Sequence, residues 1–215
     1  MTIKGYILDI DNTLVNSTEA HYRSWKRALE ENGIHKERDV VIAEFGRPTN
    51  KIAETLAGGD QKLGNKVAKE KTDYLLETFA DADLFDHVEA LIEKLHGSDL
   101  KISFASSNFN EVIEHFLKIH KWDSIASGFA GIDDVNFAKP HPAMLFKCIG
   151  QMQLVPKECV MVGDSIYDLE AGRRAGTRTI GVCTGHYSRD ELDKYQPDLI
   201  LNEIGELVEM LPLDF

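Results

Sequence analysis

The chain has 215 residues, of which 43% are hydrophobic and 28% charged, and its formal net charge is -12. This length suits one large core or a core with a smaller appendage. The acidic balance argues against nucleic-acid and anionic-membrane partners, because both bind basic surfaces, and no apolar run approaches the roughly 20 residues that span a bilayer. The three cysteines lack metal-type spacing. We therefore expect a cytoplasmic protein with reduced thiols, whose oligomeric state stays open.

The chain begins with a short apolar run, residues 5–8, that leads into two carboxylates, Asp9 and Asp11. A run this short, followed by Asp, Asn and Thr, predicts a buried strand that continues into a loop. Because side chains alternate along a strand, Asp9 and Asp11 should point the same way. Two carboxylates so close together repel each other unless a cation lies between them or one of them binds a proton. A surface turn would explain this segment if it stood alone.

A long, mainly helical stretch follows the first strand. Apolar residues at helical spacing, such as Trp25 and Leu29, precede the stop signal Asn32-Gly33. The same reasoning predicts helices at residues 21–32, 49–57, 62–79 and 88–95.

The pattern then changes to an alternation of strands and helices. We expect strands at residues 101–105, 128–132, 159–162, 179–182 and 198–201, with helices at 111–119, 142–151, 167–175 and 189–194. Such alternation predicts an α/β fold with a parallel sheet covered on both faces. The helical block at residues 16–83 is then an insertion, and residues 1–15 and 84–215 form the core domain.

Polar residues follow four of the predicted strands. In open parallel sheets, ligands bind outside the carboxyl ends of the strands. Each segment alone could be a turn, a helix cap or a surface lysine, but their order on successive strand ends points to one site. The segments are Asp9 with Asp11, Ser106-Ser107-Asn108, Lys139-Pro140-His141-Pro142, and Gly163-Asp164-Ser165 with Asp168.

With these segments the chain resembles the haloacid dehalogenase-like hydrolase superfamily, and its phosphoglycolate phosphatase-like subgroup. Asp9-Ile10-Asp11-Asn12-Thr13 matches the aspartate pair, with Asn12 where the family usually has Gly. Ser106 matches the family's hydroxyl, Lys139 its lysine, and Asp164 with Asp168 its closing acidic pair. The resemblance implies a Rossmann-like parallel sheet core with an inserted small α-helical cap domain at residues 16–83.

The resemblance also implies a Mg2+-dependent phosphatase that hydrolyses a small phosphate monoester, phosphoglycolate-like or a sugar phosphate. Asp9 would attack phosphorus and form an aspartyl-phosphate, and Asp11 would act as acid and then base. Ser106 and Lys139 would hold the charged phosphoryl oxygens. The residues expected at the metal are Asp9, Asp11 through its carbonyl oxygen, Asp164 and Asp168, which would act through water or by supporting the other ligands.

Further substrate contacts are expected from the loops around the site. Asn12, Ser107 and Asn108 would lie near the phosphoryl group. In the cap, Arg47 or Lys51 could meet a second anionic group of the substrate, although either could be a plain surface charge.

Two alternatives to the phosphatase remain open. A sugar-phosphate mutase uses the same core and a similar cap. A catalytically idle binding module would be marked by loss of Asp9, Asp11, Lys139 or Asp164, all of which are present. Dehalogenation is disfavoured by Asp11, because a halide leaves without needing a proton.

Overall fold

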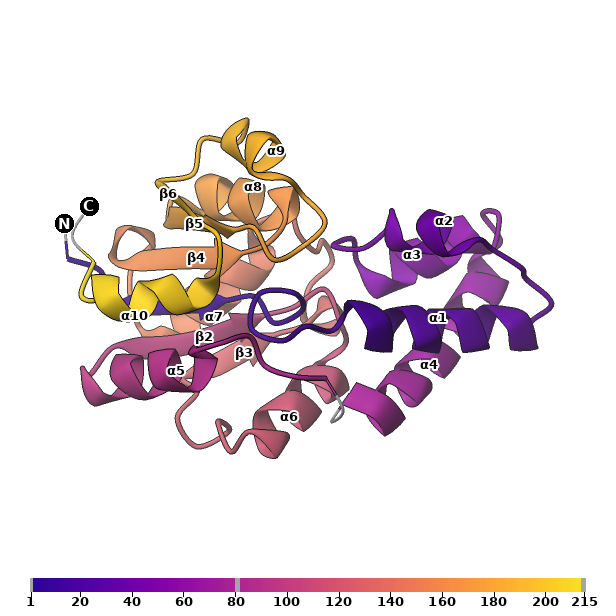
Figure 1. The fold of residues 1–215 in the computed structure, drawn as a ribbon, viewed down its shortest axis with the longest axis horizontal. Coiled ribbons are helices and arrows are strands. Elements are labelled where there is room, and N and C mark those ends of the chain that lie inside the picture. The colour runs from indigo at the N-terminus through magenta and orange to yellow at the C-terminus, as the bar shows by residue number, and fades with distance from the viewer. Residues whose placement is uncertain (1, 80–81, 214–215) are drawn as a thin grey trace.

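The computed structural model of the chain describes residues 2–79 and 82–213, and its centre is a six-stranded parallel sheet in the order β3-β2-β1-β4-β5-β6 (Figure 1). The central strand β1 lies between β2 and β4, so its carboxyl end opens at the middle of one sheet edge. The strands are β1 Gly5–Leu8, β2 Lys101–Ala105, β3 Gly128–Ala130, β4 Cys159–Gly163, β5 Arg178–Val182 and β6 Leu199–Leu201. This sheet confirms the predicted α/β fold.

The strand order places a crevice at the end of β1. From β1 the chain continues through β2 and β3 on one side and then crosses over to β4, β5 and β6 on the other, and ligand sites of parallel sheets lie where the strand order reverses in this way. All four residues of β1 are buried, as expected for a central strand covered on both faces.

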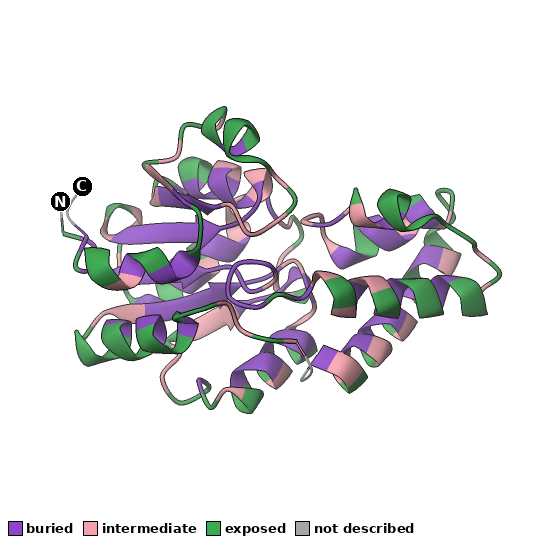
Figure 2. Cartoon of the chain, in the orientation of Figure 1, coloured by how far each residue is buried: buried purple, intermediate pink, exposed green. Residues whose placement is uncertain are grey.

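Helices cover both faces of the sheet, and the alternation of β1 side chains shows which face each helix covers. Tyr6 and Leu8 belong to the hydrophobic cluster that also contains residues of α5, α6 and α10, whereas Ile7 packs with α7 and α8. Figure 2 shows that the helices turn their buried sides toward the sheet. The helices are α5 Val88–Gly97, α6 Asn110–Ile119, α7 Ala143–Met152, α8 Ile166–Ala175, α9 Arg189–Asp193 and α10 Leu207–Met210.

The remaining helices form a block beside the carboxyl ends of the strands (Figure 1). They are α1 Thr18–Glu31, α2 Arg38–Ile42, α3 Thr49–Leu56 and α4 Gln61–Thr78. The block has a hydrophobic cluster of its own, built around Trp25, Ile52 and Val67. Among residues 2–79 and 82–213, no helix is long and apolar enough to cross a membrane.

Gly64 lets α4 approach the backbone of α3, and its replacement tests this packing. A Cβ atom at Gly64 would lie 2.9 Å from Glu54 Cα and 3.0 Å from Glu54 N. Alanine normally stabilises a helix interior by about 1 kcal/mol relative to glycine. Here it must push two backbones apart, so Gly64→Ala is expected to lower the free energy of unfolding by about 1–3 kcal/mol. Urea denaturation measures the change.

Gly150→Ala is the matched control. Gly150 also lies within a helix, α7, but a Cβ atom there would meet nothing within 4 Å. This variant should be as stable as the wild type or slightly more stable. Equal stability changes in the two variants would contradict the packing argument.

Candidate active site

A cavity of about 50 Å³ lies between the carboxyl end of the sheet and the helical block. Its small volume has room for only a small polar group together with a few waters. It is lined by residues from the loops after β1, β2, β4 and β5, from the loop before α7, and from helices α1, α3, α4 and α8. The predicted site residues among them are Asp9, Asp11, Asn12, Arg47, Ser107, Asn108, Lys139, Asp164 and Asp168.

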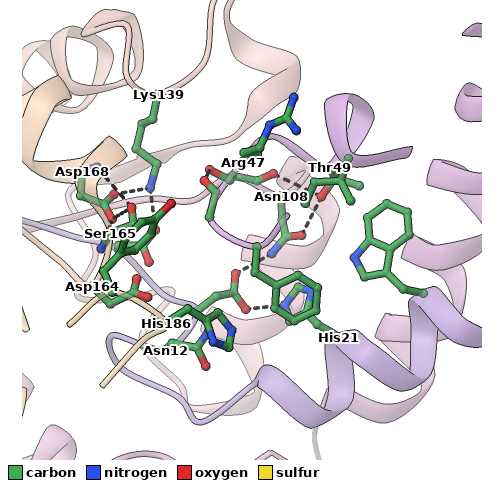
Figure 3. Close-up of a pocket in the computed structure, with 18 of the residues that line it drawn as sticks. Asn12, His21, Arg47, Thr49, Asn108, Lys139, Asp164, Ser165, Asp168 and His186 are labelled. Carbon is green, nitrogen blue, oxygen red and sulfur yellow. Dashed lines mark hydrogen bonds and ion pairs between the residues drawn. The ribbon is translucent and has the colours of Figure 1, made fainter. Parts of the chain in front are cut away.

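Lys139 is the buried cation of the site. It lies in the loop before α7, is 3% exposed, and its Nζ donates to Asp9 Oδ1 and to Asp168 Oδ1, each at 2.6 Å. A third bond, at 3.0 Å, goes to the carbonyl oxygen of Ala105 at the end of β2. Figure 3 shows Lys139 reaching toward Asp168. The lysine therefore joins the ends of β1 and β2 to the first turn of α8.

Three buried carboxylates surround this cation on one side. One oxygen from each of Asp9, Asp164 and Asp168 lies within 4.8 Å of the others. Thr13 Oγ1 lies 3.3 Å from both Asp9 Oδ2 and Asp164 Oδ1. Asp168 has both oxygens engaged, because Ser165 Oγ donates to its Oδ2 at 2.5 Å while Lys139 binds its Oδ1. Asp9 and Asp164 are thus the freer carboxylates, and a role through water suits Asp168 better.

The charges of this cluster are strongly perturbed. Burial raises the pKa of Asp9 to about 8, although the charge of Lys139 opposes the rise. Burial and the neighbouring charge of Asp9 raise the pKa of Asp164 well above its ordinary value. Burial alone would lower the pKa of Lys139, but Asp168 and Asp9 raise it above its usual range. Three buried carboxylates thus share one lysine, and their all-oxygen donor set suits Mg2+.

Asp11 has different surroundings from Asp9. His21 Nε2 lies 2.6 Å from Asp11 Oδ1, which also accepts from Ser17 Oγ at 2.8 Å. Asp11 Oδ2 accepts from Asn108 Nδ2 at 2.6 Å and from Ser106 Oγ at 3.3 Å. Burial would raise the pKa of Asp11, but the charge and hydrogen bond of His21, the charge of Lys71 and the Ser17 hydroxyl lower it to about 2. Asp11 is therefore ionised, and its carboxylate faces the helical block.

Two buried residues of the helical block complete this half of the site, and sequence reasoning missed both. His21 comes from α1, and burial lowers its pKa. Lys71 comes from α4, is 0% exposed, and donates to Asn108 Oδ1 at 3.2 Å. Burial lowers the pKa of Lys71 to about 7. One signal was available: Lys71 stands midway between Val67 and Leu75, at the four-residue spacing of a buried helix stripe.

The other predicted residues are less uniform. Asn12 is buried, and its φ of 55° is in the left-handed region. Asn tolerates this conformation better than most residues, which explains how it can stand where the family usually has Gly. Ser107 Oγ donates to the carbonyl oxygen of Gly46 at 3.2 Å. Arg47 lines the cavity and is paired with Glu44. Lys51 lies outside the cavity lining.

Lys51 is exposed on the surface of α3. Its Nζ lies 2.8 Å from Glu54 Oε2 one turn further along the helix. The structure therefore brings together every predicted site residue around the cavity except Lys51, with Ser106 placed just behind Asp11.

A parallel α/β sheet whose central strand ends in a lysine-paired carboxylate, with further buried acids from β4 and α8, defines the class of protein. The chain belongs to the haloacid dehalogenase-like hydrolase family, whose model matches residues 6–182. This confirms the resemblance found in the sequence.

Particular relatives share nearly the full length of the chain. It is 28% identical to pyrophosphatase PpaX of Anoxybacillus flavithermus over 221 aligned residues, and the alignment covers 98% of each protein. It is 29% identical over 215 residues to pyrophosphatase PpaX of Bacillus mycoides, again over 98% of both.

Solved structures share the fold. A predicted phosphoglycolate phosphatase from Haemophilus somnus has a TM-score of 0.87 at 21% identity, covering 98% of both chains. CbbY from Rhodobacter sphaeroides, solved in complex with phosphate, has a TM-score of 0.82 at 21% identity, covering 95% of this chain and 96% of that one.

Proposed function

We propose that the protein is a Mg2+-dependent phosphatase that hydrolyses a small phosphate monoester through an aspartyl-phosphate on Asp9. The observation that carries this proposal is the buried Asp9–Lys139 ion pair at the end of β1, with Asp164 beside it. Phosphoryl transfer asks mainly for alignment and charge neutralisation, which this arrangement can supply. The cytoplasmic location stays a prediction.

The contacts of Asp9 suit a nucleophile. Lys139 holds Asp9 Oδ1 at 2.6 Å, whereas among residues 2–79 and 82–213 the one hydrogen-bond partner of Asp9 Oδ2 is the hydroxyl of Thr13 at 3.3 Å. In the first step a carboxylate oxygen of Asp9 forms a bond to phosphorus, and the bond from phosphorus to the leaving oxygen breaks. Lys139 neutralises charge at the carboxylate and the transferring group throughout.

Asp11 has surroundings that suit a proton-transferring group. In its ionised form it can take a proton from the water that hydrolyses the intermediate. To protonate the leaving oxygen in the first step it must itself first gain a proton. In its imidazolium form His21, whose Nε2 lies 2.6 Å from Asp11 Oδ1, can give it one.

The donor set described above fits Mg2+. Asp9 and Asp164 would hold the ion, with the Asp11 carbonyl oxygen and, through water, Asp168. When bound, the ion would supply positive charge to the phosphoryl oxygens.

We further propose that residues 16–83 are a cap domain over a core of residues 1–15 and 84–215. The block has its own hydrophobic cluster, and it meets the core beside the site, where the Thr49 N–H donates to the Ser107 carbonyl oxygen at 3.1 Å. The cavity of about 50 Å³ below it favours a small substrate. Arg47 is the cap cation placed to meet a second anionic group.

Inorganic pyrophosphate is a second candidate substrate. The relatives named pyrophosphatase PpaX match 98% of the chain. Pyrophosphate is small enough to suit the cavity and carries a second anionic group, and its leaving group is phosphate rather than an alcohol. The sugar-phosphate mutase alternative stays open, because it would use the same residues.

Phosphate release from a panel of substrates tests the proposal. With Mg2+ we expect hydrolysis of a generic aryl phosphate and of at least one of phosphoglycolate, a sugar phosphate and pyrophosphate. Exhaustive chelation should reduce the rate to background, because the clustered carboxylates need a cation before an anionic substrate can approach. Ca2+ should not restore it, since its larger and looser coordination shell disturbs in-line geometry.

Two outcomes would redirect the assignment. Activity that survives chelation would contradict the metal role of Asp9 and Asp164. Conversion of a sugar phosphate to its isomer without phosphate release would favour the mutase.

A further inference from the structure

Asn108, in the loop after β2, joins the core to the helical block through one buried carboxamide. The residue is 4% exposed. Its Nδ2 donates to Asp11 Oδ2 at 2.6 Å and to Ser106 Oγ at 3.4 Å. Its Oδ1 accepts from Thr49 Oγ1 of α3 and from Lys71 Nζ of α4, both at 3.2 Å. Figure 3 shows Asn108 between Thr49 and the His21 side of the cavity.

These contacts use the whole hydrogen-bonding capacity of the side chain. A carboxamide offers two N–H donors and two acceptor positions on its oxygen. All four have partners within the protein, so none is left for a phosphoryl oxygen. The orientation of the amide is also determined, because a flipped amide would place its oxygen against the Asp11 carboxylate and its NH2 group against the Lys71 ammonium.

We propose that Asn108 is a positioning residue that couples the seating of the helical block to the orientation of Asp11. Thr49 and Lys71 hold the amide oxygen only while α3 and α4 lie on the core. With the oxygen held there, the NH2 group points at Asp11 and holds its carboxylate beside His21. When the block moves away, the amide loses both partners on that side and Asp11 loses a fixed donor. The catalytic part of this proposal rests on the proposed function.

The first experiment measures the seating of the block without any assay of activity. The Thr49 amide donates to the Ser107 carbonyl oxygen at 3.1 Å across the contact between block and core, so its hydrogen exchange, followed by NMR, reports opening. Asn108→Leu keeps a similar shape but removes all four hydrogen bonds. We expect Thr49 exchange to accelerate by about tenfold or more, since several buried hydrogen bonds are lost.

Asn108→Asp separates the two halves of the amide. It keeps an oxygen for Thr49 and Lys71, so Thr49 exchange should stay at or below the wild-type rate. It removes the donor to Asp11 and adds a negative charge beside that carboxylate. For a substrate that the wild type hydrolyses, kcat should therefore fall by about tenfold or more in both Asn108 variants, with KM within about twofold. The control Asn65→Asp, at an exposed position of α4, should change neither readout.

Each contrary result overturns a defined part of the proposal. A raised KM with unchanged kcat would make Asn108 a direct substrate contact. Unchanged Thr49 exchange in Asn108→Leu would refute the coupling to the block. Equally faster exchange in β1 and at Thr49 would reduce Asn108 to a general stabiliser of the fold. If the wild type hydrolyses none of the panel, the proposed function fails, while the exchange measurements still decide the coupling.

Discussion

Replacing Asp9 by asparagine is expected to abolish turnover, with kcat lower by about 10⁴-fold or more, while the fold is retained. A carboxamide is a poor nucleophile toward phosphorus, yet its oxygen can still accept the hydrogen bond that Lys139 Nζ makes with Asp9 Oδ1 at 2.6 Å. Burial raises the pKa of Asp9 to about 8, which means that burying the ionised carboxylate is unfavourable, and a neutral amide removes this cost. Thermal unfolding should therefore show a stability equal to or above that of the wild type.

Single-turnover experiments with an acid quench measure the intermediate directly. Wild-type protein quenched during the turnover should carry a transient acyl phosphate on the chain before product release, and Asp9→Asn should carry none. Asp123→Asn, at an exposed carboxylate, is the control and should behave as the wild type. Normal product release from wild-type protein that never becomes phosphorylated would rule out the covalent route.

The sequence predicted the sheet well because its strands are short apolar runs between helical segments. The argument that Asp9 and Asp11 share one direction relied on strand alternation continuing past residue 8. In the structure β1 ends at Leu8 and Asp11 lies in the following turn, in a bridge with Val15. Strand alternation therefore does not determine the direction of the Asp11 side chain. Among the described contacts, the carboxylates of Asp9 and Asp11 share no hydrogen-bond partner.

The helical block was harder to predict from sequence. The short helix α2, Arg38–Ile42, was not expected, because two adjacent valines in five residues give no helical stripe. The contribution of Lys71 depends on how α4 packs over a loop some 37 residues further along the chain. A motif search places the core residues of the site, since these follow strands directly. It does not place side chains whose role comes from tertiary packing.

Replacing Lys139 by methionine is expected to lower the free energy of unfolding by about 3–5 kcal/mol, in addition to abolishing activity. Methionine has a similar length and fills the same buried space, so the main loss is the charge. Without this charge, Asp9 and Asp168 each lose an ion-pair partner at 2.6 Å. The three buried carboxylates, which lie within 4.8 Å of one another, then lose Lys139 as their counterion. Denaturant titration in the presence of a chelator measures this change.

Mg2+ makes the test specific to the proposed metal site. If Asp9 and Asp164 bind the ion, saturating Mg2+ should stabilise Lys139→Met more than it stabilises the wild type, because the ion then supplies the charge that the lysine gave. Lys147→Met is the control: Lys147 pairs with Asp134 near the surface, so its loss should change stability by at most about 1 kcal/mol with or without Mg2+. An equal response of both variants to Mg2+ would mean that the carboxylates around Lys139 do not form the cation site.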